Sequence, residues 1–317
     1  MKKLLAGLAL GALAMVGTAH AQSESFPSQP IKFIVPLGPG SGADTNTRAL
    51  ADRIQKAAGV PAIVENRPGA DLIIGTSSAL NAPPDGHTVF MITPSAVVIN
   101  PLFIKDLPYD PKKIRPILHL TNNVGVLVTA ADSRFNTLQD VLDEARKQPK
   151  SVSIGLYGNT YRLGAQALSR AAGVEFNDIP YKGFGQTIND VIGGMTETAL
   201  VDLGGALPLI ESGKLKALAV GSDKRLDVAP NIPTVSESGF PGYSLYIFVG
   251  YAVHADTPEP VFKKLEAMLQ QVASAPELKT LLTQHAGTYF VGNPGKPFAD
   301  FIDNEVKKAR EAMAAGQ

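Results

Sequence analysis

The residues best suited to chemistry form a glycine-rich loop, Leu37–Gly42, near the start of the chain. An apolar, β-branched run at Ile31–Val35 precedes the loop, and a helical pattern at Asp44–Ala58 follows it. Backbone N–H groups in the first turn of a helix have no partner within the helix, and the helix dipole favours negative charge there. A strand, a glycine loop and a helix N-terminus in this order therefore predict a binding site for an anion.

A dinucleotide fingerprint is one alternative for this loop, because Glu65 follows the next predicted strand at a suitable distance. The fingerprint requires the spacing G-x-G-x-x-G, however, and this loop has G-x-G-x-G with Pro39 inside it. The sequence also lacks the G-K-[ST] element of a phosphate-binding loop. A purely structural glycine turn stays open beside the anion site, and we expect no cofactor.

Four further loops rich in hydrogen-bond donors follow predicted strands. They are Thr93–Ser95, Tyr157–Arg162, Lys182 with Gly183, and Asp202 with Leu203. Open α/β sheets bind their ligands at the carboxyl ends of parallel strands, where such loops lie. Hydroxyls, amides, one Arg, one Lys and backbone N–H groups suit a carboxylate ligand. The alternative for any single loop is an ordinary helix cap or turn.

The side chains that enzymes commonly use show no recognisable catalytic pattern. The sequence has no Cys, which excludes disulfides, thiolate metal sites and cysteine nucleophiles. Beyond the N-terminal segment, no His stands three or four residues from another His or an acid, so we expect no metal. An enzyme acting on a carboxylate stays an alternative, with Asp44, Asp71 and Asp202 as the acids near the loops.

The elements that must position these loops alternate between strand and helix. A first series of strands and helices extends over residues 31–92, and a second extends over residues 124–220. Such alternation predicts parallel sheets with helices on their faces. The longest β-like run, Ser244–Val253, is a candidate strand that returns from the second series to the first. We therefore expect an α/β fold of two lobes joined by a hinge of two crossing strands.

The N-terminal segment has the features of an export signal. Lys2 and Lys3 precede an apolar run at Leu4–Val16, and small residues stand two positions apart in Ala19-His20-Ala21. We predict a signal peptide, residues 1–21, that is cleaved after Ala21 during export to the periplasm. The apolar run is shorter than the roughly 20 residues that span a bilayer. Basic and acidic residues are balanced at 29 each, so no nucleic-acid surface is expected.

Several short motifs follow one another along the chain from about Pro27 onward. They are Ile34–Pro36 with its glycine loop and Asp44, Val64–Ala70, Ala82–Thr88, Asn100–Leu102, Leu107–Pro111, Pro180–Gly183, Ser212–Ala219 and Pro233–Gly239. In this order the motifs resemble the Bug-type extracytoplasmic solute receptors of tripartite tricarboxylate transporters. The resemblance implies a type II-like periplasmic binding protein with two lobes, each built on a mostly parallel sheet. We expect residues 22–125 and 249–317 in the first lobe and residues 126–248 in the second.

The resemblance also implies that the lobes close on a small carboxylate, partly through bridging waters. The ligand-binding residues expected are Leu37, Gly38, Pro39, Gly40, Ser41, Asp71, Thr93, Ser95, Tyr157, Asn159, Thr160, Arg162, Lys182, Gly183, Asp202 and Leu203. The partner implied is a membrane permease of one large and one small subunit, and we expect the receptor itself to be a monomer. A periplasmic sensor that presents its closed form to a signalling partner is the alternative.

The sequence departs from the family pattern at three places. Asp71 and Leu72 replace glycines that usually follow Pro-Gly-Ala, and Tyr161-Arg162 replaces a small or polar residue and a His. Leu203–Gly205 is shorter and less polar than its usual counterpart. We therefore expect selectivity to lie at Tyr157–Arg162 and Asp71. Arg162 offers a fork for one carboxylate, and Tyr157 and Tyr161 offer flat faces for a ring, which suits a dicarboxylate or an aromatic acid.

Overall fold

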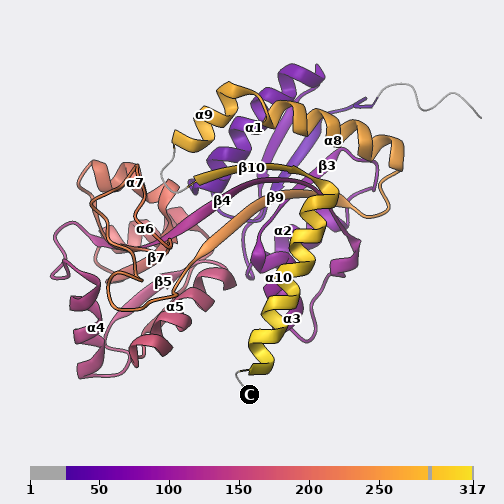
Figure 1. The fold of residues 1–317 in the computed structure, drawn as a ribbon. Coiled ribbons are helices and arrows are strands. Elements are labelled where there is room, and N and C mark those ends of the chain that lie inside the picture. The colour runs from indigo at the N-terminus through magenta and orange to yellow at the C-terminus, as the bar shows by residue number, and fades with distance from the viewer. Residues whose placement is uncertain (1–25, 285–287, 316–317) are drawn as a thin grey trace, which may run out of the picture.

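The longest of the described strands, β4 (Ile114–Ala130), extends through both halves of the molecule (Figure 1). A computed structural model describes residues 26–284 and 288–315, so the predicted signal peptide lies outside the described residues. The strands follow the order β2-β1-β3-β9-β4-β7-β5-β6, and β8 and β10 also pair with β4. Strand β9 (Tyr246–His254) lies antiparallel beside the first part of β4.

The first lobe is built on the strands on the β9 side of this order. Strand β1 (Ile31–Val35) pairs in parallel with β2 (Ala62–Asn66) and β3 (Thr88–Ile92). Its other elements are α1 (Gly42–Ala58), α2 (Ile73–Leu80), a π-helix η1 (Ser95–Ile99), α3 (Asn100–Phe103), a 3-10 helix η2 (Pro111–Lys113), α8 (Glu259–Ala273), α9 (Pro276–Gln284), β10 (Thr288–Pro294) and α10 (Gly295–Ala315).

The second lobe is built on the strands on the other side of β4. Strand β5 (Ser153–Leu156) pairs in parallel with β6 (Asn177–Pro180) and β7 (Thr198–Asp202), while β7 and β8 (Leu215–Val220) each pair antiparallel with β4. The helices of this lobe are α4 (Leu138–Lys147), α5 (Asn159–Ala172), α6 (Phe184–Ile192) and α7 (Leu203–Glu211).

Alternate residues of the first-lobe strands face opposite layers of helices. Phe33 and Met91 belong to a core cluster that includes residues of α1 and α8. Their neighbours Ile34 and Phe90 belong to a second cluster, with residues of α2 and α10. This is the period of two that a strand covered on both faces requires. No helix within the described residues is both long enough and apolar enough to cross a bilayer.

The crossing between the lobes is held by a ring of backbone hydrogen bonds. Gly125 N donates to Leu245 O at 3.0 Å, Leu245 N donates to Gly221 O at 2.7 Å, and Gly221 N donates to Gly125 O at 2.8 Å. Gly125 lies in β4, while Leu245 precedes β9, so these bonds tie the two crossing segments together. The predicted return strand is thus present as β9, with its first residue at Tyr246. The exact division of the lobes at residues 125 and 248 stays a prediction.

Two parts of the predicted fold need correction. The sheets are mixed rather than mostly parallel, because both crossing strands lie antiparallel to their neighbours. The sequence pattern predicts that the second series of strands and helices begins at residue 124. In the structure β4 already begins at Ile114, and its early part contains buried polar residues, His119, Thr121 and Asn123. These interrupt the apolar run by which a central strand is recognised.

Candidate functional site

Loops from both lobes enclose a small inner cavity beside the crossing strands. Its volume is about 20 Å³, which is room for about one water molecule. The expected residues that line it are Leu37, Ser41, Thr93, Ser95, Tyr157, Thr160 and Asp202. Ala43, Leu72, Asn123, Gly158, Tyr161, Ile247 and Val249 complete the lining.

A second, outer pocket of about 190 Å³ adjoins the inner cavity. The expected residues Asp71, Arg162 and Lys182 line it, and Leu37 lines both spaces. The remaining expected residues line neither space: Gly38, Pro39, Gly40, Asn159, Gly183 and Leu203. Leu203 is fully buried at the start of α7.

The N-terminus of α1 is occupied by carboxylates of the chain itself. Gly40 N donates to Asp44 Oδ2 at 3.1 Å, and Gly42 N donates across the cleft to Asp202 Oδ1 at 2.9 Å. Ser41 Oγ accepts from Asp44 N at 3.1 Å and caps the helix. The glycine loop therefore holds anions as its sequence predicts, but internal ones, and the N–H group of Gly40 is not free for a ligand.

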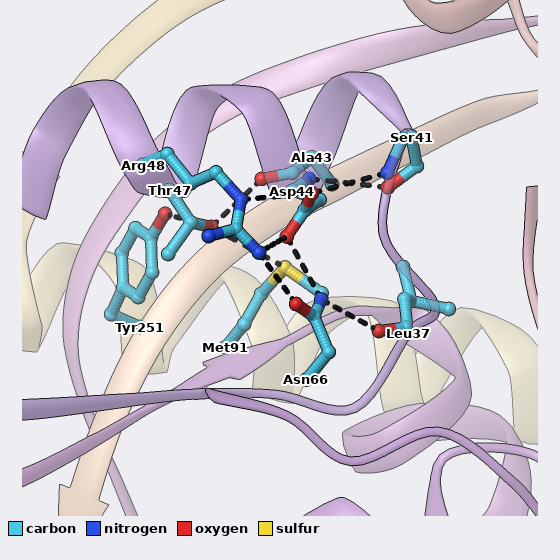
Figure 2. A network of polar contacts seen from close by, with 10 residues as sticks. Leu37, Ser41, Ala43, Asp44, Thr47, Arg48, Asn66, Met91 and Tyr251 are labelled. Carbon is cyan, nitrogen blue, oxygen red and sulfur yellow. Dashed lines mark hydrogen bonds and ion pairs between the residues drawn. The ribbon is translucent and has the colours of Figure 1, made fainter. Parts of the chain in front are cut away.

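Asp44 holds the glycine loop in place (Figure 2). Its Oδ1 accepts from Asn66 Nδ2 at 2.8 Å and from Arg48 Nη2 at 3.1 Å. Asn66 Nδ2 also donates to Leu37 O at 3.0 Å, which ties the end of β2 to the loop. Because Asp44 is buried and its oxygens are engaged, it acts on the site by positioning the loop.

Asp202 lies at the centre of the contacts between the lobes. Besides Gly42 N, it accepts from Gly205 N at 2.8 Å and from Tyr157 Oη at 2.6 Å. It therefore joins the N-termini of α1 and α7, one from each lobe, and each helix dipole favours its negative charge.

The phenols of Tyr157 and Tyr161 lie next to each other beside Asp202. Their oxygens are 3.3 Å apart, within hydrogen-bond distance, and their ring centroids are 4.6 Å apart. Burial, followed by the charge of Asp202, raises the pKa of both phenols well above the usual value of 10. Both tyrosines are therefore neutral at physiological pH and offer O–H groups rather than phenolates.

Further hydrogen bonds join the lobes at the N-terminus of α5. Thr160 N donates to Ser95 Oγ at 3.0 Å, and the two hydroxyl oxygens are 2.8 Å apart. Asn159 Nδ2 donates to Asn100 Oδ1 at 2.8 Å. The structure thus brings the expected residues Ser95, Asn159 and Thr160 close together. Their polar groups form hydrogen bonds between the two lobes.

Arg162 faces Asp71 across the outer pocket. Its Nη1 lies 3.7 Å from Asp71 Oδ2 and donates to Asn159 Oδ1 at 2.8 Å. Asn100 Nδ2 in turn donates to the backbone oxygen of Asp71 at 2.7 Å. The ion pair is long and partly exposed, and such pairs contribute at most about 1 kcal/mol to stability. Arg162 therefore keeps most of its capacity to bind a second carboxylate.

Asn123 is one of the lining residues that the expected set did not contain. It lines the inner cavity, it is buried, and its Oδ1 has no hydrogen-bond partner among the described residues. A buried amide without a partner is uncommon. The sequence did offer a signal for Asn123. The polar pair Asn122-Asn123 stands directly before the apolar run Val124–Val128.

Comparison with known proteins identifies the family. A family model described as "Tripartite tricarboxylate transporter family receptor" matches residues 46–315. The chain belongs to this receptor family. The receptor is 30% identical over 312 residues to a protein of Pseudomonas sp. (strain P51), described as "UPF0065 protein in tcbD-tcbE intergenic region". That match covers 97% of the receptor and 92% of its relative.

Solved structures confirm the expected fold of the receptor. A "periplasmic transporter" shares 31% identity and the periplasmic binding protein BugD shares 27%. Each has a TM-score of 0.85, and each match covers 92% of the receptor and 98% of the other chain. An R. palustris protein "with adipate" has the same fold, with a TM-score of 0.86 at 24% identity, over 92% of the receptor and 99% of that chain. The resemblance to Bug-type receptors and the α/β periplasmic-binding-protein fold are confirmed.

Proposed function

We propose that the protein is a periplasmic receptor that captures a small carboxylate between its lobes and delivers it to a tripartite tricarboxylate-type membrane transporter. The convergence of hydroxyl, amide and backbone donors from both lobes on one cleft carries this proposal. A ligand that contacts both walls stabilises the closed state, because only that state offers all the contacts at once.

The charges around the cleft favour a ligand carboxylate in the outer pocket. Among the described residues that line the inner cavity there is no Lys or Arg. Arg162 and Lys182 line the outer pocket, and each hydrogen bond from such a cation to a carboxylate contributes about 1.5–3 kcal/mol. The hydroxyls of Thr93, Ser95 and Thr160 then face the rest of the ligand.

The volume of the inner cavity requires the lobes to move. Ligand pockets usually measure about 300–1,000 Å³, whereas the inner cavity measures about 20 Å³ and the outer pocket about 190 Å³. A di- or aromatic carboxylate enters when the contacts between the lobes open and the crossing strands bend. The hydrogen bonds from Thr160 N to Ser95 and from Asn159 to Asn100 are those that a ligand replaces.

The acids near the cleft support binding rather than catalysis. Asp44 is held by Arg48 and Asn66, and Asp202 accepts from two backbone N–H groups and one phenol. Asp71 faces Arg162. Each is engaged where a general base would have to face a substrate, so we propose a receptor without enzymatic activity.

The experiment that tests this function is a panel of carboxylates measured by shift of the melting temperature, with mass spectrometry for turnover. Monocarboxylates, dicarboxylates including adipate, tricarboxylates and aromatic acids form the panel. Arg162→Ala should lower the affinity for the best acid at least tenfold, whereas Arg170→Ala, an exposed arginine on the same helix, should not. A protein that binds no acid of the panel, or converts one, contradicts the proposal. Capture of a membrane permease by the exported, ligand-bound protein tests delivery.

A further inference from the structure

The turn before α2 contains three consecutive residues that are not glycine and have positive φ angles. Ala70, Asp71 and Leu72 have φ values of 46°, 50° and 72°, directly after Gly69 at 125°. L-residues rarely adopt this left-handed region, because Cβ then lies too close to the backbone. Non-glycine residues in this conformation persist only where the surrounding structure holds them, and they gather at ligand sites.

Contacts on both sides hold this turn in its conformation. Asn100 Nδ2 donates to Asp71 O at 2.7 Å, and Thr76 N donates to Leu72 O at 3.1 Å. In the first turn of helix α2, a Cβ added to Gly75 would lie 2.6 Å from Pro36 Cβ. The start of α2, directly after this turn, is therefore packed against the segment that joins β1 to the glycine loop.

The side chain of Leu72 points from this turn into the space between the lobes. Leu72 is buried, and it lines both the inner cavity and the outer pocket. A Cβ added to Gly158 in the second lobe would lie 3.2 Å from Leu72 Cδ1. Leu72 thus stands between the two spaces and against the opposite lobe, on a backbone that disfavours any side chain.

We propose that Leu72 is the residue that limits the length of the ligand, by separating the inner cavity from the outer pocket. The proposal rests on the proposed function. A carboxylate held by Arg162 in the outer pocket extends its other end toward the inner cavity, and the isobutyl group of Leu72 lies between them. Removal of this group joins the two spaces and admits a longer acid.

Three variants separate the blocking side chain from the strained backbone. Leu72→Gly removes both, Leu72→Ala removes most of the side chain and keeps a Cβ at positive φ, and Ala70→Gly relieves strain while keeping Leu72. Each variant is measured for melting temperature without ligand. Each is then titrated by calorimetry with straight-chain α,ω-dicarboxylates from four to ten carbons and with the matching monocarboxylates.

The expected result has two independent parts. Both Leu72 variants should bind acids at least two carbons longer than the longest acid the parent binds, with a gain of tenfold or more, while Ala70→Gly keeps the parent's limit. Without ligand, Ala70→Gly should melt roughly 1 to 3 °C above the parent, and Leu72→Gly should melt above Leu72→Ala.

The proposal is overturned if neither Leu72 variant gains a longer acid, including the case in which parent and variants bind none. If the parent binds no carboxylate but a Leu72 variant binds one, the proposed carboxylate ligand of the parent is contradicted. The role of Leu72 is supported in that case. A parent that binds carboxylates with the same length limit as both variants supports the proposed function and overturns the role of Leu72.

Discussion

The carboxylate of Asp202 in the second lobe accepts a hydrogen bond at 2.9 Å from the backbone N–H of Gly42 in the first lobe. These two residues are 160 positions apart in the sequence. The carboxylate lies where a helix N-terminus attracts anions, so the chain itself supplies a carboxylate across the cleft. The bond favours the closed arrangement of the lobes without any contribution from a ligand.

Asp202→Asn should loosen the closed arrangement. The amide is neutral and has one acceptor oxygen, so it cannot accept from Gly42 N, Gly205 N and the Tyr157 phenol as the carboxylate does. We expect the free energy of unfolding to fall by about 1–3 kcal/mol. We also expect the radius of gyration from small-angle X-ray scattering to rise. Asp132→Asn, an exposed acid in the second lobe, is the control. An unchanged radius of gyration would show that other contacts hold the lobes.

The stability of the protein should fall at alkaline pH because of the buried phenols. The pKa values of Tyr157 and Tyr161 are raised in the folded state by burial, whereas unfolded tyrosines ionise near pH 10. A raised pKa stabilises the folded state fully below pH 10, and this contribution is lost as the pH rises further. Each such tyrosine adds up to about 1.4 kcal/mol per pH unit to the slope.

Urea unfolding between pH 8 and pH 11 measures this slope. Tyr157→Phe should make it shallower, and should also lower stability at pH 8 because Asp202 Oδ2 loses its donor. Tyr289→Phe, at a largely exposed position, should change the slope less. If the free energy of unfolding falls with pH equally steeply in the parent and in Tyr157→Phe, the raised pKa of Tyr157 does not contribute to the alkaline loss of stability.

Asn123→Leu should stabilise the protein and weaken ligand binding. The unpartnered Oδ1 of Asn123 is buried at a cost in free energy, and leucine has a similar volume without polar atoms. We expect about 1 kcal/mol of added stability, together with an affinity for the best carboxylate that is lower by about tenfold, or 1.4 kcal/mol.

Thr121→Val is the matched control for this prediction. The hydroxyl of Thr121 is also buried and has no partner among the residues that the structure describes. It belongs to the same strand but does not line the inner cavity. Thr121→Val should therefore add stability without loss of affinity. If both variants keep the parent's affinity, Asn123 does not contact the ligand.

Gly183→Ala should prevent full closure while each lobe stays folded. The backbone of Gly183 is extended, with a φ of 172°, so alanine causes no backbone strain there. Its added Cβ would lie 2.7 Å from Gly38 N and 2.9 Å from Gly38 Cα in the first lobe. We expect an affinity at least tenfold lower, and a lower melting temperature because the hydrogen bond from Gly42 N to Asp202 across the lobes is weakened. In Gly38→Ala the added Cβ would lie 3.6 Å from its nearest neighbour, an ordinary contact distance. This variant should therefore reduce affinity much less, and titration calorimetry measures both affinities.

Much of the local structure was predictable from short-range signals. β1 extends over the apolar run Ile31–Val35, and Thr137 with Asp140, at the spacing typical of a capping box, forms one at the start of α4. Strand β10 was missed, because it lies beyond both predicted series and beyond the predicted return strand. Its residues acquire strand character by pairing with β4, a partner distant in sequence and invisible to any local pattern.

The candidate site was predictable as a set of loops but not as a set of contacts. Strand-end positions indicated Ser41, Thr93, Tyr157 and Asp202, and the structure brings these residues to one cavity. That Asp202 bonds to Gly42 across the cleft depends on how the lobes meet. The role of Leu72 depends likewise on a backbone conformation and on the opposite lobe at Gly158.

The sequence by itself determined the alternation of strands and helices, the glycine loop as a place for an anion, and the donor-rich ends of the strands. These follow from backbone propensities and from hydrogen bonds between residues a few positions apart. Only the tertiary structure decided which anion the loop holds and which donors remain for a ligand. Those outcomes depend on contacts between Gly42 and Asp202, Ser95 and Thr160, and Asp71 and Arg162, which exist only once the crossing strands have brought the two lobes together.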